Sequence, residues 1–353
     1  MKAIGIRTGA SAPELLDVPR PEPGSGEVLV RTLRVGVDGT DHEVIEGDHG
    51  GFPEDEEYLV LGHEAVGVVE DPNDTRFEAG EVVVPTVRRP PADGENGYFE
   101  RGEADMAPPG ETAERGIDGA HGFMSEYFVS EERFLVGIPA ELVPLGFLVE
   151  PISITEKALE LARASRSTFE WEPETALVLG NGSLGLLTVT ILTAEMDVYC
   201  LGRRDRPDPT IAFIEDRGGT YVDSRETPVE EIPEVYEPVD LVYEATGYAK
   251  HATTSLYALA PNGVAALLGL SEPWEFEVDG GRFHREFVME NKAMVGSVNS
   301  GPRHFRAAAE TLGGLPAGAL DDLVTRVVDY HEFEGAFENG DDIIKTAVRF
   351  GEL

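Results

Sequence analysis

Cysteine is almost absent from this chain of 353 residues, since Cys200 is the only one. A single thiol excludes a disulfide framework and any metal site built from several cysteines. Long apolar runs are also missing, because glycine and asparagine interrupt the most apolar stretch, 177–194. We therefore expect no membrane-spanning helix. The first residues also lack the basic region and apolar core of a signal peptide.

Basic residues are scarce as well, with 28 Lys and Arg against 67 Asp and Glu, for a formal net charge of −39 at pH 7. Lysine occurs at only five positions, so Arg supplies 23 of the 28. The carboxylates are spread along the chain, which favours adaptation of the whole protein over an acidic docking tail. Such self-repulsion is screened at molar salt, where the Debye length falls to about 3 Å. The composition predicts a high-salt cytoplasm and argues against nucleic acid as a partner.

The length leaves room for two domains, and the hydrophobic content of 41% is that of a globular protein. Short Val-rich segments at 27–33, 65–70 and 81–86 predict strands in the first third. Residues 88–115 have an irregular, Gly- and acid-rich composition, so we expect a lobe of solvated loops there.

Strand-like and helix-like segments alternate from residue 176 onward, which predicts right-handed βαβ units and a parallel sheet. A helical pattern precedes them from Pro151, and the tail reads as an Ala-rich helix from Pro302 and a strand at 346–350. We expect this tail to return to the first domain. The predicted fold is α/β, with a β-rich catalytic domain (1–155 and 299–353) and a doubly wound, parallel-sheet cofactor domain (156–298).

A glycine-rich turn connects the strand predicted at 176–179 to the next helix. It is a G-x-G-x-x-G sequence: Gly180, Asn181, Gly182, Ser183, Leu184 and Gly185. In this context the glycines permit a tight turn and close approach of the backbone to a pyrophosphate, which the helix N-terminus then binds. The turn predicts a dinucleotide cofactor.

The end of the second strand of this domain distinguishes the two dinucleotides. An NAD site usually carries an acidic residue there for the ribose hydroxyls. Here Gly202 is followed by Arg203 and Arg204, and two guanidinium groups favour the 2′-phosphate of NADP. Asp205 leaves some NAD binding open, and the alternative is a solvated turn in which Asp205 pairs with one arginine.

The first domain contains a His-Glu pair in the sequence Gly62-His63-Glu64-x-x-Gly67, together with Asp38 and Glu150. A His-Glu pair by itself is more often a hydrogen-bonded structural pair than part of a metal site. The presence of Asp38 and Glu150 as further candidate ligands favours a metal site. The sequence resembles the zinc-dependent medium-chain dehydrogenase/reductase family, whose G-H-E-x-x-G signature it matches, over nearly its whole length. Within the family, the segments 119–126, 180–185, 202–204 and 291–299 are most similar to the haloarchaeal glucose dehydrogenases.

The resemblance implies a GroES-like catalytic domain, a Rossmann cofactor domain and one catalytic zinc. It places the zinc on Asp38, His63 and Glu150, with Glu64 as a neighbouring group or an alternate ligand. Most members carry Cys where this chain has Asp38. An Asp–His–Glu ligand set is a harder set of donors than one that contains a thiolate. We therefore expect zinc to be bound less selectively, so that Mn²⁺ or Co²⁺ can substitute.

Many members of the family hold a second, structural zinc on four cysteines in the lobe that corresponds to 88–115. The lobe here has none, so we expect no structural zinc. Its carboxylates are expected to be solvated acid surface: Glu95, Glu100, Glu103 and Asp105.

The implied activity is that of a glucose 1-dehydrogenase, which oxidises an aldose at C1 to the lactone with hydride transfer to NADP. Thr40 matches the hydroxyl that passes the substrate proton toward solvent, and His42 could end the relay. The resemblance suggests Thr40, Glu114, Glu150, Asn291 and Asn299 as sugar contacts, with Asn299 also near the cofactor. A further acidic sugar contact of the relatives falls on Ile154, which leaves the exact sugar open.

Two alternatives remain. One is a polyol or alcohol dehydrogenase of the same family. The other is a zinc-free, quinone-reductase-like NADPH-binding protein, against which the joint presence of the proposed ligands argues. Members of the family commonly pair through their cofactor domains, so we expect a homodimer or a homotetramer.

Overall fold

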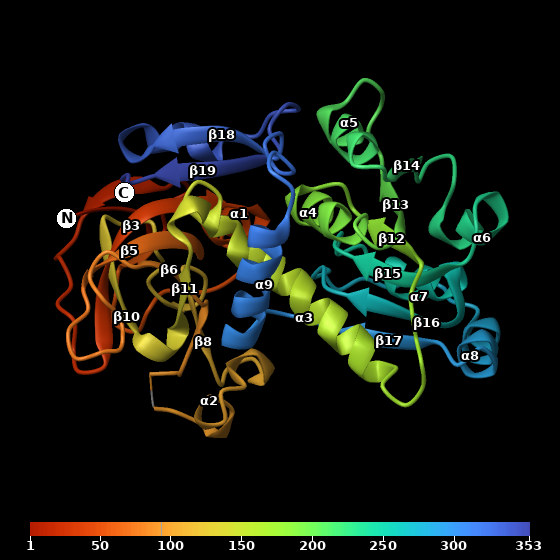
Figure 1. Cartoon of the computed structure of the whole chain (residues 1–353), viewed down its shortest axis with the longest axis horizontal. Coiled ribbons are helices and arrows are strands. Elements are labelled where there is room, and N and C mark those ends of the chain that lie inside the picture. Colours follow the sequence, from red (N-terminus) through yellow and green to blue (C-terminus); the bar gives the residue numbers. More distant parts are fainter. Residues whose placement is uncertain (93) are drawn as a thin grey trace. The chain divides into compact units, whose positions relative to one another are not determined.

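The computed structural model describes residues 1–92 and 94–353, which divide by their contacts into two units (Figure 1). Unit 1 comprises Met1–Ser153, Asn299–Gly314 and Val324–Leu353, and unit 2 comprises Ile154–Val298 and Leu315–Leu323. The short segment 315–323 thus packs with unit 2, although the sequence-based division assigned all of 299–353 to the catalytic domain. As a division by function, that assignment stays a prediction.

Unit 1 is built around a seven-stranded sheet in the order β11-β6-β5-β3-β19-β18, with β10 also paired to β3. The strands are β3 (Glu27–Val37), β5 (Glu64–Asp71), β6 (Val82–Pro85), β10 (Tyr127–Glu131), β11 (Leu135–Ile138), β18 (Val324–Asp329) and β19 (Lys345–Arg349). The tail returns as predicted, because β19 pairs antiparallel with β3, Thr346 opposite Val37. This pairing places residues 309 positions apart in one core.

Two three-stranded sheets complete the β-structure of unit 1. One has the order β2-β1-β4, with β1 (Lys2–Arg7), β2 (Glu14–Asp17) and β4 (Tyr58–Val60). The other has the order β7-β8-β9, with β7 (Arg88–Arg89), β8 (Ala113–Arg115) and β9 (Gly119–Ala120). The helical segments are α1 (Gly39–Glu46), α2 (Gly97–Glu100), η1 (Ala104–Met106), η2 (Glu132–Phe134), η3 (Ala140–Leu142), η4 (Gly146–Leu148), α9 (Pro302–Gly314) and η6 (Tyr330–Phe337), while α3 (Val149–Ser165) begins in unit 1.

The lobe at 88–115 is more ordered than its composition predicted. Arg88 and Arg89 are buried in β7, and Phe99, Ala104, Ala107 and Phe134 form a small apolar core. Asp105, expected on the solvated surface, is buried, so the prediction was wrong there. The composition did not indicate this order because two buried arginines, rather than an apolar run, organise the segment.

Unit 2 contains the predicted parallel sheet, six strands in the order β14-β13-β12-β15-β16-β17. The strands are β12 (Thr175–Leu179), β13 (Asp197–Gly202), β14 (Thr220–Asp223), β15 (Val239–Glu244), β16 (Leu259–Leu267) and β17 (Ala293–Gly296). The helical segments are α4 (Ser183–Leu192), α5 (Pro209–Asp216), η5 (Val229–Glu231), α6 (Ile232–Val235), α7 (His251–Ala258) and α8 (Gly280–Met289). This order is the doubly wound, Rossmann arrangement expected from the alternating pattern.

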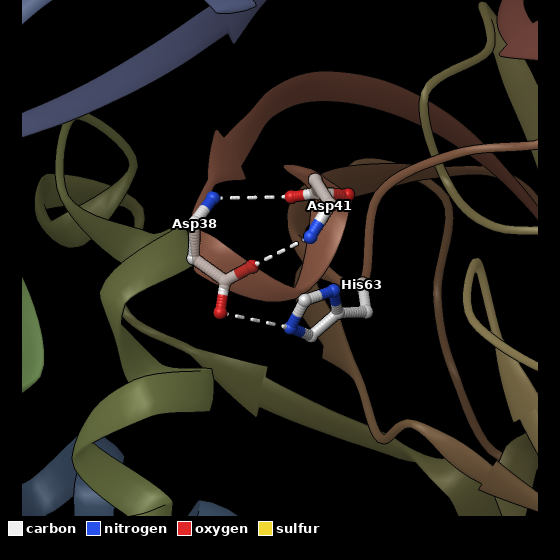
Figure 2. Close-up of side chains that lie close together, drawn as sticks. All are labelled: Asp38, Asp41 and His63. Carbon is white, nitrogen blue, oxygen red and sulfur yellow. Dashed lines mark hydrogen bonds and ion pairs between the residues drawn. The ribbon is translucent and has the colours of Figure 1, made fainter. Parts of the chain in front are cut away.

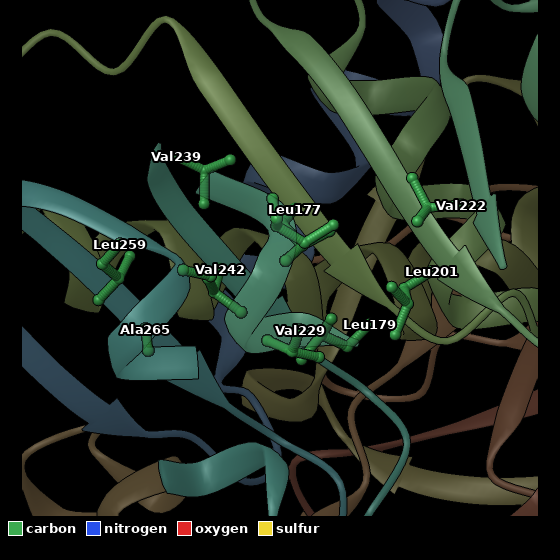
Figure 3. Packing of buried hydrophobic residues seen from close by; sticks show 11 residues of the cluster. Leu177, Leu179, Leu201, Val222, Val229, Val239, Val242, Leu259 and Ala265 are labelled. Carbon is green, nitrogen blue, oxygen red and sulfur yellow. The ribbon is translucent and has the colours of Figure 1, made fainter. Parts of the chain in front are cut away.

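Branched aliphatic side chains fill the core of unit 2, as Figure 3 shows for Leu177, Leu179, Leu201, Val222 and Val242. Each of these is at most 3% exposed. Buried strands of a parallel sheet are apolar on both faces, which is why they appear in the sequence as short continuous runs rather than as an alternation. Among the described residues, no helix is long and apolar enough to cross a membrane.

Candidate metal centre and cofactor turn

Asp38 lies between the end of β3 and the start of α1, where it caps the helix. Its Oδ1 accepts a hydrogen bond from Asp41 N at 3.2 Å, and Asp41 Oδ2 accepts one from Asp38 N at 3.1 Å (Figure 2). This reciprocal capping box satisfies free N–H groups of the first turn. Asp41 Oδ1 also accepts from Gly62 N at 3.2 Å. The helix start is thereby fixed against the segment that carries His63.

His63 precedes β5 and is only 5% exposed. Its Nε2 lies 3.6 Å from Asp38 Oδ2 (Figure 2). Gly62 has φ +84, and a Cβ there would lie 2.5 Å from Met124 Cγ. Glycine at this position of the motif is therefore required both by the left-handed backbone and by the packing.

Glu150 completes the group from the first turn of α3. It is 6% exposed, and ligand atoms of His63, Glu64 and Glu150 all lie within 4.8 Å of one another. Atoms of Asp38, Asp41 and His63 form a second such group. We call these five residues the metal-site cluster.

Glu64, the first residue of β5, makes a buried ion pair with Lys345 of β19, with Nζ 2.7 Å from Oε1 and 2.6 Å from Oε2. A Cβ at Gly36 of β3 would lie 1.9 Å from Glu64 Oε2. The glycine in β3 thus makes the space that the carboxylate occupies. The pair fixes Glu64 beside His63.

The cluster concentrates buried negative charge, and its pKa values reflect this. Burial raises the pKa of Asp41 to about 7 and that of Glu150 to about 8, against the attraction of His63. Burial also raises the pKa of Asp38, but the charge and hydrogen bond of His63 together with the charge of Lys345 outweigh it, and the net pKa falls. Burial lowers the pKa of His63, but the nearby carboxylates, Asp38 first among them, together hold that pKa well above the usual value.

These properties fit a bound divalent cation. Three buried carboxylates and the half-buried Asp38 face only one histidine and one lysine, so a cation would relieve their mutual repulsion. His63 Nδ1 is buried and has no hydrogen-bond partner among the described residues. Imidazole and carboxylate donors suit zinc, and three of them with an open position are what a catalytic site needs. In the part of the chain that the structure describes, the groupings of potential ligands all contain His63.

The predicted proton-relay residues lie on α1, next to the metal-site cluster in sequence. Thr40 is half-buried in the first turn of the helix. His42 is also half-buried and packs edge-on against Phe337, with ring centroids 6.3 Å apart. Their roles stay predictions.

Two of the predicted sugar contacts are brought together. Asn299 Nδ2 donates to Glu114 Oε1 at 2.7 Å, although the two residues are 185 positions apart. Asn299 has the left-handed φ of +56. Asn291, by contrast, lies in an exposed left-handed turn just before β17. Ligands bind outside the carboxyl ends of such strands, so its position at the opposite end lends no support to a substrate contact.

The glycine-rich turn lies at the carboxyl end of β12, where the strand order reverses between β13 and β15. Gly180 has φ +110, and a Cβ at Gly185 would lie 1.9 Å from Gly180 O. Gly182 precedes α4 and offers no side-chain cap, so the N–H groups of the first helical turn stay open to an anion. The predicted steric roles of Gly180 and Gly185 agree with this geometry, and the approach of a pyrophosphate to Gly182 stays a prediction.

The arginines at the end of β13 are exposed. Among the described residues Arg203 makes no hydrogen bond or ion pair, whereas Arg204 Nε lies 4.0 Å from Asp208. Arg204 is also held through its backbone, since its N donates to Tyr221 Oη at 2.7 Å and its O accepts from that hydroxyl at 3.0 Å. Asp205 pairs with Arg225 at 2.6 Å, so the pairing that we considered with Arg203 or Arg204 is replaced by one with another segment.

Sequence reasoning missed Asp41, Lys345 and Arg88. Asp41 had a signal, because an acidic residue three positions after an N-cap Asp predicts a capping box. Lys345 had a weaker signal: it is one of only five lysines in the chain, and it lies in an apolar strand. No local signal identifies Arg88, whose partners lie in other segments.

Comparison with known proteins gives full-length matches. The family model for the alcohol dehydrogenase GroES-like domain matches residues 24–140, and that for the glucose dehydrogenase C-terminus matches 143–350. The chain is 64% identical to a glucose 1-dehydrogenase of Haloferax mediterranei and 60% identical to one of Haloarcula marismortui, in each case over 100% of both chains.

The solved structures agree. The glucose dehydrogenase of Haloferax mediterranei in complex with NADP, zinc and gluconolactone superposes with a TM-score of 0.98 at 63% identity, over 100% of both chains. A butanediol dehydrogenase of Bacillus subtilis reaches a TM-score of 0.80 at 22% identity over 99% of both chains, which shows the shared fold alone. The chain therefore belongs to the zinc-dependent medium-chain dehydrogenase/reductase family and shares 60–64% identity with haloarchaeal glucose 1-dehydrogenases.

Proposed function

We propose that this chain is a glucose 1-dehydrogenase that oxidises D-glucose at C1 to the lactone and transfers the hydride to NADP. The observation that carries the proposal is its 60–64% identity, along 99–100% of the chain, to four haloarchaeal relatives that bear this name. The polyol and alcohol dehydrogenases among the similar structures are 17–22% identical, so they support only the fold. A zinc-free NADPH-binding protein would have no need of the buried metal-site cluster.

Asp38, His63 and Glu150 are the residues proposed to hold one zinc. When bound, zinc supplies Lewis-acid polarisation of a hydroxyl oxygen, and NADP supplies a two-electron hydride acceptor. The pair formed by Glu64 and Lys345 holds the Glu64 carboxylate beside His63. Glu64 can therefore orient the zinc ligand His63 or act as an alternate ligand of the metal.

The oxidation breaks the C1–H bond, whose electron pair leaves as hydride, and the O1–H bond, whose proton leaves as H⁺. Thr40, two residues after the ligand Asp38, is the group proposed to accept that proton and pass it to His42. The half-buried position of both side chains on α1 supports a path toward solvent. The products are the lactone, NADPH and one proton.

Sugar binding is assigned to Glu114, Glu150 and Asn299. Glu114 and Asn299 share a hydrogen bond that uses Glu114 Oε1, and Glu114 Oε2 has no protein partner among the described residues. A carboxylate oxygen and an amide oxygen close together suit the several hydroxyls of a pyranose.

For the cofactor, the backbone of 180–185 is proposed to hold the pyrophosphate, and Arg203 and Arg204 the 2′-phosphate. The guanidinium of Arg203, which has no partner among the described residues, supports a preference for NADP. NAD, which lacks that phosphate, is expected as a weaker acceptor. Asn299 follows β17, so it is also proposed to contact the cofactor.

The assembly is proposed to be a homodimer or a homotetramer in a high-salt cytoplasm. In support, β17 ends the six-stranded sheet with partly exposed Met294 and Val295, and Val288 and Met289 of α8 are 56% and 67% exposed. Light scattering coupled to size-exclusion chromatography in molar KCl tests this, and a monomer would contradict it.

The function itself is tested by steady-state kinetics in molar KCl with glucose, galactose, xylose, sorbitol and ethanol, each with NADP and NAD. We expect the highest kcat/KM for glucose with NADP, and lactone as the product. A higher kcat/KM for sorbitol or ethanol would support the polyol or alcohol alternative instead.

A further inference from the structure

Arg88 of β7 is a buried guanidinium that links two parts of unit 1. It lies opposite Glu114 of β8 in the strand register, and its Nε donates to Glu114 Oε1 at 3.0 Å. Its Nη1 donates to three carbonyl oxygens, of Ala104 at 3.3 Å, Asp105 at 3.2 Å and Ala107 at 2.8 Å. The side chain is 4% exposed, so these bonds form away from water and constrain both partners strongly.

Glu114 is held at one oxygen only. Its Oε1 accepts from Arg88 and, at 2.7 Å, from Asn299 Nδ2. Its Oε2 has no protein partner within the described chain, and the side chain retains 16% exposure. The carboxylate is thus oriented by two donors, with its second oxygen available to a ligand hydroxyl.

The carbonyls that Arg88 binds are themselves anchored. Asp105, in the same turn, makes a two-point ion pair with Arg303 of α9, with both N–O distances 3.2 Å. A Cβ at Gly301 would lie 2.7 Å from Asp105 Oδ1, so the turn packs directly against the segment just after Asn299. Arg88 therefore connects Glu114 to the turn at 104–107, and this turn is itself held against the segment that follows Asn299.

We propose that Arg88 is a positioning residue for sugar binding, which fixes the Glu114 carboxylate before the substrate arrives. A free glutamate side chain loses rotamer entropy when a ligand orders it, and a fixed side chain has already lost it. This inference rests on the proposed function, in which Glu114 contacts the sugar.

Arg88→Lys keeps the charge but removes the forked guanidinium, so it cannot bind Glu114 and the carbonyls at once. We expect the KM for glucose to rise about tenfold, with kcat and the Kd for NADPH within about twofold of wild type. Arg89→Lys is the matched control. Arg89 is the buried neighbour on β7 and also binds carbonyls, those of Thr86 and Arg88, but within the described chain it makes no hydrogen bond or ion pair with Glu114. Its KM for glucose should stay at the wild-type value.

Glu114→Asp keeps the inference testable if Arg88→Lys does not fold, and a double variant tests the coupling of the two residues if it does. Glu114→Asp retains the charge but shortens the side chain, so it should also raise the KM about tenfold. In a Glu114→Gln background, where Arg88 no longer has a carboxylate to position, Arg88→Lys should change the KM by less than about twofold. A wild-type KM in Glu114→Asp, or equal KM values in the two lysine variants, would overturn the inference while glucose oxidation by the wild type leaves the proposed function intact. A wild-type enzyme that turns over no sugar overturns both.

Discussion

Lys345 and Glu64 form an ion pair that is shut off from solvent, with their side chains 1% and 2% exposed. Removing one partner of a buried pair leaves an uncompensated charge, at a cost of about 3–5 kcal/mol. We therefore expect Lys345→Met to lower the free energy of unfolding by about that amount, as measured by denaturant titration in molar KCl.

Two controls accompany this variant. Lys2→Met removes an exposed ion pair with Asp17 and should leave stability nearly unchanged. Adding Glu64→Gln to Lys345→Met removes the orphaned charge and should restore part of the loss. Equal destabilisation by Lys2→Met and Lys345→Met would show that the buried pair has no special role.

Arg203 and Tyr221 are predicted to affect the two cofactors unequally. Arg203→Gln removes the unpaired guanidinium, and Tyr221→Phe removes the two hydrogen bonds that hold the backbone of Arg204. Each should weaken NADPH binding about tenfold and change NADH binding by less than twofold, as read from fluorescence titrations. Tyr199→Phe, which removes a hydroxyl bonded to the exposed Glu237, is the control. Equal losses for both cofactors would refute the assignment to the 2′-phosphate.

Cys200 should be inert in the folded protein. It is fully buried in β13, and burial raises the pKa of its thiol to about 12. The thiolate is the reactive form, so a water-soluble thiol reagent at pH 8 should label the chain only after denaturation. Because the folded-state pKa lies above the ordinary value of 9.0, the thiol's contribution to stability is complete below pH 9 and is lost as the pH rises toward 12. Rapid labelling of the native protein at pH 8 would contradict the burial.

Stability is expected to rise with KCl concentration. At a net charge of −39, self-repulsion is long-ranged in dilute buffer and is screened as the Debye length falls from about 30 Å at 0.01 M salt to 3 Å at 1 M. Denaturation midpoints should climb toward molar KCl. Sucrose at matched osmolality separates screening from general solute exclusion, and a profile that is flat in KCl would remove the halophilic interpretation.

The features that the sequence predicted best depend on local pattern. Alternating runs gave the parallel sheet of unit 2, because a buried strand and its following helix are each encoded within about ten residues. The turn at Gly180 could be predicted equally well, because its glycines are required by steric constraints between residues that are close in sequence.

Features that depend on contacts between distant segments could not be predicted in this way. Glu64 and Lys345 are separated by 281 positions, and no local sequence signal near either residue identifies the other as its partner. The lobe at 88–115 was misread because a buried Arg88 looks in the sequence like a surface charge. The assignment of Asp38, His63 and Glu150 as zinc ligands relied on family resemblance and stays a prediction. The structure adds that Asp38 and Glu150 each belong to a group of potential ligands that contains His63.

Zinc content measured together with activity tests whether the proposed ligands hold a catalytic zinc. We expect one zinc per chain, by elemental analysis, in the wild type and in the control His331→Ala, whose histidine is exposed and pairs with Asp329. His63→Ala should lose both the metal and glucose oxidation, and a chelator should remove the two together from the wild type. Glucose oxidation that persists in protein free of zinc and other divalent metals would contradict the account.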